Sequence, residues 1–113
     1  MTITNTVLQA GTVLPTAAAA IVTGGAGAVT VITRMVMANS TASAATVTVY
    51  RVPSAGTPGA GNVIVSGRSI VAAPGTDLMP EIVGMVLGPG DTIQALAGTA
   101  SAINAFASGY VVT

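Results

Sequence analysis

The chain has 113 residues, which is the length of one domain, and it contains no cysteine and no histidine. Charged residues make up 5% of it and the net charge is zero, whereas about 25% is normal for a soluble domain. This composition excludes disulfides, thiolate metal sites, nucleophile–histidine pairs and, because lysine is also absent, Schiff-base chemistry. It also lacks the basic patch that nucleic-acid binding requires.

The scarcity of charge indicates a surface that copies of the chain or a partner cover, because zero net charge favours association. The alternative is a sparsely charged surface coated with Thr and Ser. We expect no membrane segment, since the uncharged stretch Leu14 to Thr33 is interrupted by Pro15 and several glycines. We expect no export signal of the usual kind either, because Met1 to Thr6 carries no positive charge.

Residues 1–9 alternate Thr with Ile, Asn and Val, which predicts a short edge strand or an extended arm that pairs with a neighbour, ending at Ala10-Gly11. Residues 17–23 favour a strand. Residues 29–38 and 45–52 are rich in β-branched residues and predict an antiparallel pair, joined by a polar turn at 39–43, around which the chain folds. Met35 and Thr33 are expected on one face of the first strand, and Arg34 on the other.

Pro53 to Asn62 is rich in Pro and Gly and predicts an exposed loop. Further short strands are expected at 63–65, 68–72, 78–83, 85–87, 92–97 and 103–112, the last broken or bulged at Gly109. Turn signals recur about every eight to twelve residues. The prediction is an all-β fold: one antiparallel β-sandwich over residues 1–113, jelly-roll or immunoglobulin-like, with seven to nine short strands.

The only carboxylates are Asp77, Glu81 and Asp91, and the two aspartates lie in turns, where they are expected to accept backbone hydrogen bonds. A calcium ion at Asp91 is a minor alternative. The glycines at 24–27 predict a turn rather than a phosphate-binding loop. We therefore predict no enzyme, no catalytic, cofactor-binding or metal-binding residue, no cofactor and no small-molecule substrate. The methionines Met35, Met37, Met79 and Met85 are expected to fill a core short of aromatic residues.

Interface contacts are predicted at the N-terminal segment, the Pro/Gly loop and the arginines, since Arg is favoured at interfaces. The arginines fit equally well as solvated ends of strands. The candidate interface residues are Thr2, Ile3, Thr4, Arg34, Arg51, Pro53, Pro58 and Arg68.

Three stretches occur in an order that resembles a group of small bacteriophage structural proteins. They are NSTASAATVTVYRVPSAGTPGAGN at 39–62, SIVAAPGTDL at 69–78 and VLGPGDTIQALAGTASAINAFASGY at 86–110. The resemblance extends over 31–113, whereas the first thirty residues depart from it.

The resemblance implies a β-sandwich virion component. The first expectation is a capsid decoration or cement protein that packs between capsomers on the outer surface of the phage head, after assembly in the host cytoplasm. Its partners would be the major capsid protein and copies of itself, as a homo-oligomer. The alternative is a tail, neck or fibre module with a joining or receptor-binding role. Neither expectation involves nucleic acid or a membrane.

Overall fold

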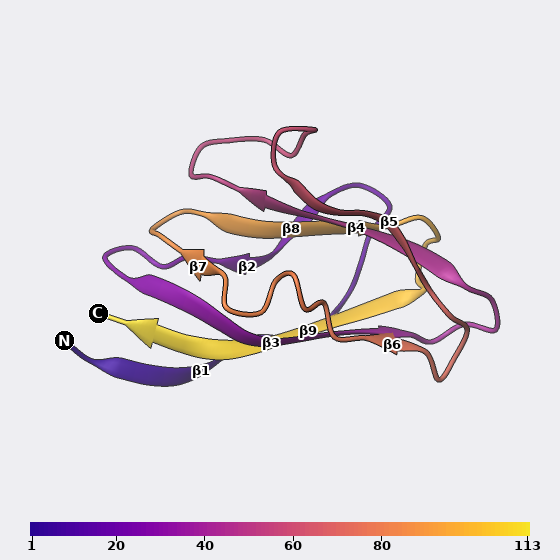
Figure 1. Ribbon diagram of the computed structural model, residues 1–113, viewed down its shortest axis with the longest axis horizontal. Coiled ribbons are helices and arrows are strands. Elements are labelled where there is room, and N and C mark those ends of the chain that lie inside the picture. Colours follow the sequence, from indigo (N-terminus) through magenta and orange to yellow (C-terminus); the bar gives the residue numbers. More distant parts are fainter.

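The computed structural model describes all 113 residues and is an all-β sandwich without helices, as predicted (Figure 1). The strands are β1 (Ile3–Val13), β2 (Ala19–Thr23), β3 (Val29–Asn39), β4 (Ala45–Val52), β5 (Val63–Ile70), β6 (Thr76–Asp77), β7 (Val86–Leu87), β8 (Thr92–Ala97) and β9 (Ile103–Val112).

Two antiparallel sheets pack face to face (Figure 1). One has the order β1-β9-β3-β6, with β7 also paired to β3, and the other has the order β2-β8-β4-β5. Strands β6 and β7 pair with opposite ends of β3, so they occupy one strand position in two pieces. With these two pieces counted as one strand, the order is that of an eight-stranded jelly roll. Of the two predicted topologies, the structure therefore has the jelly roll rather than the immunoglobulin-like one.

The predicted antiparallel pair of β3 with β4 is wrong. Strand β3 lies between β9 and the β6/β7 position, whereas β4 lies between β8 and β5 in the other sheet. The segment after Asn39 therefore crosses from one sheet to the other. Its short polar residues satisfy backbone groups at this corner: the Asn39 side-chain amide donates to the Ser43 and Ile70 carbonyls at 2.9 and 3.1 Å. The same turn chemistry serves a hairpin and a corner between sheets, so the sequence could not distinguish them.

The predicted faces of β3 hold only for part of the strand, because a β-bulge changes the alternation. Ile32 lies opposite Gly109 and Arg34 lies opposite Ser108, so Thr33 is the extra residue. Beyond the bulge, Met35 and Met37 point into the core, while Arg34 lies on the outer face. Strand β9 runs unbroken through Gly109, so the irregularity expected there belongs to β3.

Three other predicted segments differ from the structure. The strands expected at 63–65 and 68–72 are one continuous strand, β5, which ends at Ile70. Residues 78–83 are not a strand: Met79 and Ile82 are instead buried from a series of turns between β6 and β7. Of residues 1–9, those from Ile3 on belong to β1, which continues past Gly11 to Val13 and pairs along its length with β9. Of the two alternatives for this segment, the structure has the edge strand. The strands predicted at 45–52, 92–97 and 103–112 have the predicted bounds.

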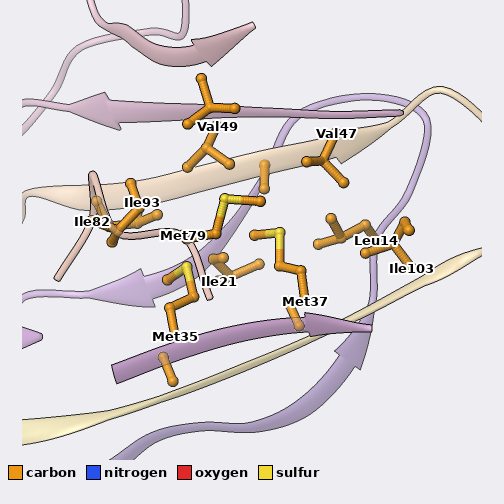
Figure 2. Packing of buried hydrophobic residues seen from close by; sticks show 14 of the residues in the cluster. Leu14, Ile21, Met35, Met37, Val47, Val49, Met79, Ile82, Ile93 and Ile103 are labelled. Atoms are coloured by element: carbon orange, nitrogen blue, oxygen red, sulfur yellow. The ribbon is translucent and has the colours of Figure 1, made fainter. Parts of the chain in front are cut away.

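The core between the sheets is built from aliphatic side chains and methionine. Met35 and Met37 of β3 reach across toward Met79, which lies in the segment between β6 and β7 (Figure 2). Met85 packs against the edge of this cluster. No aromatic residue belongs to it. Strand β9 instead directs Ala105, Ala107 and Gly109 inward, and these small residues leave room for the methionines.

Gly109 lies opposite Ile32, beside the bulge in β3, and a substitution there tests how closely β3 and β9 approach. A Cβ at this position would lie 1.9 Å from the Val31 carbonyl oxygen, which is backbone and has little freedom to move. We expect Gly109→Ala to lower the free energy of unfolding by about 3 kcal/mol or more, since overpacking usually costs about 1–3 kcal/mol and here the clash is with backbone. Gly59→Ala is the control, because nothing lies within 4 Å of its added Cβ. Equal stability of the two variants in urea unfolding would contradict this packing.

Candidate functional site

Arg51 and Asp91 form an ion pair at one end of the sandwich. The Arg51 Nη2 donates to Asp91 Oδ2 at 3.1 Å and to the Val86 carbonyl at 2.9 Å. Asp91 also accepts the backbone N–H groups of Ser54 at 2.9 Å and Gly88 at 3.0 Å. These contacts fasten the start of the loop at Pro53–Asn62 to the turn that precedes β8. The predicted turn-capping role of Asp91 is thereby confirmed.

Arg68 of β5 forms the second cluster, with Glu81 and Asp77. Its two terminal nitrogens each donate to one oxygen of Glu81, and Nη1 lies 3.5 Å from Asp77 Oδ1. Asp77 also accepts the Met79 backbone N–H at 2.8 Å, which confirms its predicted turn role. The cluster joins the edge of the four-stranded sheet to the segment between β6 and β7, so it closes one side of the sandwich.

One carboxyl group in each cluster, Glu81 and Asp91, has a lowered pKa. The hydrogen bond from Arg68 is the main cause that lowers the pKa of Glu81 from 4.5 to about 2. The backbone N–H groups of Ser54 and Gly88, followed by Arg51, lower the pKa of Asp91. Each carboxylate is therefore held in its charged form by donors, which is the arrangement of a structural ion pair rather than of a general acid.

Arg34 is the one charged residue that no ion pair contains. It lies on the outer face of β3, beside a shallow groove of about 240 Å³ that includes Val7, Val36 and Phe106. The Phe106 ring covers the backbone of Gly11, where an added Cβ would come 2.8 Å from the ring, yet 41% of the residue stays exposed. Gln9 and Ser108 are the other polar side chains of the groove, and the unpaired guanidinium there can bind a carboxylate.

The groove belongs to a larger apolar surface, the outer face of β1, β9, β3 and β7. Residues that lie opposite one another in the strand pairing share this face, for example Ile3 with Val112 and Val29. Its exposed large apolar residues are Ile3, Val7, Val13, Val29, Val86 and Phe106. Val31, Val36, Tyr110 and Val112 lie among them, partly buried. We call this set, together with Arg34, the outer apolar face.

The outer face of the other sheet has a different composition. Thr46 lies opposite Ser69, Thr48 opposite Leu96, and Tyr50 opposite Gln94. This face is mostly polar and uncharged. It corresponds to the Thr/Ser-coated surface that was the alternative interpretation of the low charge content. The polar residues Asn5 and Ser108 also lie on the outer apolar face, but exposed apolar residues gathered on one face of a small domain often mark a contact site. The two faces of the sandwich therefore differ, and only the outer apolar face has the character of an interface.

The predicted interface residues do not gather in one place. Ile3 and Arg34 lie on the outer apolar face. Thr4 follows Ile3 in β1, and Thr2 precedes the strand. Arg51 and Arg68 are in the two ion-pair clusters. Pro53 and Pro58 are exposed in the loop, next to the Arg51 cluster in the case of Pro53. Thus only one of the three arginines is free to bind a partner.

The predicted interface segments did not include three apolar residues of the outer apolar face, Val36, Val86 and Phe106, whereas Val7 lies in the predicted N-terminal segment. Strand β9 contained a signal for them. In INAFASGYVV the larger residues Phe106, Tyr110 and Val112 alternate with Ala105, Ala107 and Gly109. Within one sheet, such alternation places large residues on one face and small ones on the other. The usual assumption that large apolar residues point inward would have reversed the two faces.

No group of three or more His, Cys, Asp and Glu side chains lies together in a way that could hold a metal ion. The structure has no helix with the length and hydrophobicity needed to cross a bilayer. Comparison of the chain with protein families, curated proteins and solved structures finds no match.

The Arg68–Glu81 pair should make the stability of the fold depend on pH. Because the pKa of Glu81 is lower in the folded chain than its ordinary 4.5, the pair's contribution to stability is present above pH 4.5 and is lost as the pH falls toward about 2. We expect Arg68→Ala to return the pKa of Glu81 toward 4.5, as measured by NMR titration of its side chain. Arg34→Ala is the control and should leave this pKa unchanged. An unaltered pKa in Arg68→Ala would refute the pairing.

Proposed function

We propose that the protein is a structural virion component, a decoration or cement protein that packs between capsomers on the outer surface of a phage head. The observation that carries the proposal is the outer apolar face with the unpaired Arg34, in a chain whose other charges are all used internally. This face would lie against the major capsid protein. The partner surface that fits is apolar, with a carboxylate placed to receive the Arg34 guanidinium.

The area of such a contact sets an upper limit on the apolar contribution to its strength. A standard interface covers about 800 Å² of each partner, and apolar burial contributes roughly 25 cal/mol per Å² before the cost of association is subtracted. Each copy would then bind the shell modestly. Many copies, each bridging neighbouring capsomers, would together resist separation of the shell, which is how a cement protein acts.

Two further points support the proposal. The order of turn and strand motifs over 31–113 resembles that of small bacteriophage structural proteins. The strand order is that of a jelly roll, a fold used by viral capsid domains and by lectins. The fold alone assigns no function, so it adds weight only together with the outer apolar face.

The alternative is a tail, neck or fibre module with a joining or receptor-binding role. One observation favours it: Phe106 and Tyr110 lie on the same face of β9, and aromatic rings are common contacts for receptors. The number of copies per virion separates the two roles. Quantitative mass spectrometry against the major capsid protein should find hundreds of copies for a cement protein. A small number that matches the symmetry of the tail or neck would favour the alternative.

Substitutions of Arg34 test whether the outer apolar face binds the capsid. We expect Arg34→Glu to weaken binding to capsid shells that lack this protein by at least tenfold, because it would place a carboxylate against a carboxylate. Arg34→Lys keeps the charge and should retain part of the affinity. Ser69→Glu adds a negative charge to the polar outer face of the other sheet and is the matched control. Co-sedimentation with shells measures all three, and equal loss in Arg34→Glu and Ser69→Glu would argue against docking through the outer apolar face.

A further inference from the structure

The four sheet edges differ in how well they are protected against pairing with another chain. Strands β6 and β7 have two residues each, and β2 has five. Strand β5 contains Gly67 at a φ of 61°, followed by Arg68, so it has an irregular backbone and a charge. Strand β1 has eleven residues with neither proline nor charge. Short strands, bulges and charges are the devices that block edge pairing, and the first half of β1 has none of them.

The unprotected part of β1 is the segment Ile3–Val7. Its pairing with β9 is regular, and register shifts begin only after Val7. The second half of β1 is held by other contacts, since the Gln9 side chain donates to the Ile21 carbonyl of β2 at 3.1 Å. Strand β1 lies at the outer edge of its sheet, with nothing beyond it (Figure 1).

The backbone groups that face this open edge can be identified from the pairing. Thr2 and Thr113 exchange two backbone hydrogen bonds, each of 2.9 Å. In an antiparallel pair the direction of the backbone groups alternates, so Thr4 and Thr6 also face β9. Ile3, Asn5 and Val7 therefore direct their N–H and C=O groups away from the sheet, where no residue of the chain accepts or donates.

The sequence of the segment Ile3–Val7 is nearly palindromic about Asn5. Around Asn5, Thr4 matches Thr6, and the β-branched Ile3 matches the β-branched Val7. We propose that Ile3–Val7 pairs antiparallel with the same segment of a second copy, about a two-fold axis at Asn5. Ile3 then lies opposite Val7 of the second copy, and the two Asn5 residues face each other. Pairs of β-branched residues and pairs of threonines are favourable cross-strand neighbours.

The directions of the free groups fit this register. Residues Ile3, Asn5 and Val7 all present groups outward, so the Ile3–Val7 and Asn5–Asn5 pairs across the axis would be hydrogen-bonded pairs, and the Thr4–Thr6 pairs between them would be non-hydrogen-bonded pairs. The segment before Arg34 contains no charge, so the two copies meet without repulsion. The two five-stranded sheets become one continuous sheet, and the two outer apolar faces lie on the same side of it. This pairing does not depend on what those faces bind.

The first experiment measures mass by sedimentation velocity over a range of concentrations. The wild-type chain should form a dimer. Asn5→Pro removes a backbone donor that has no partner within the chain, which an edge strand tolerates, and it should raise the dimer dissociation constant at least tenfold. Asn5→Thr keeps the donor and should remain dimeric, as should Arg34→Glu. A wild-type monomer at all concentrations, or a dimer that Asn5→Pro leaves intact, would overturn the proposal.

Two further variants test the two-fold axis, even where proline disturbs the strand. Asn5→Lys and Asn5→Asp should each be monomeric alone, because like charges face each other, and should form a heterodimer when mixed. Asn5→Cys should form a disulfide-linked dimer in air, since the Cα atoms of such a pair are about 5.5 Å apart. The chain has no other cysteine, and Thr46→Cys on the other sheet is the control. No heterodimer, or equal cross-linking of both cysteine variants, would exclude this axis.

Discussion

The structure depends on filling the space between two sheets without an aromatic ring. Three methionines and a set of β-branched and leucine side chains do this, because flexible thioethers fit irregular gaps. The methionines of β3 need small neighbours, and β9 provides alanine and glycine on the side that faces them. Because side chains alternate along a strand, the larger residues of β9 then point outward. An apolar outer surface is thus linked, through the alternation of a single strand, to the way the core is packed.

Much of the fold could be predicted from local patterns. The strands β4, β8 and β9 have clear alternation and definite turn residues at their ends, and the two aspartates cap the turns where they were expected. The partition of strands between the sheets could not be predicted, because the corner after Asn39 uses the same residues as a hairpin. The faces of β3 could not be assigned beyond Thr33 either. A bulge has no reliable signature in one strand, since it depends on the close approach that Gly109 allows on the next.

The candidate site was predictable only in outline. The arginines were predicted as interface residues or as solvated ends of strands, whereas two of the three, Arg51 and Arg68, are in ion pairs within the chain. Arg51 and Asp91 are forty residues apart in the chain, and Arg68 and Glu81 are thirteen apart. Such pairs form only because the sheets bring distant segments together. Arg34 is left free because the bulge at Thr33 turns it away from the core and toward an apolar surface, which is information that only the three-dimensional structure contains.

The hydrogen bonds between Thr2 and Thr113 place both ends of the chain at one corner of the sandwich. Tension applied through the two ends would therefore separate β1 from β9 one hydrogen bond at a time, as a zipper opens. Tension applied across a sheet face instead loads many contacts together. A sandwich built in this way is mechanically weak through its termini and strong through its faces. In the proposed role in a shell, the load would therefore have to enter through a face.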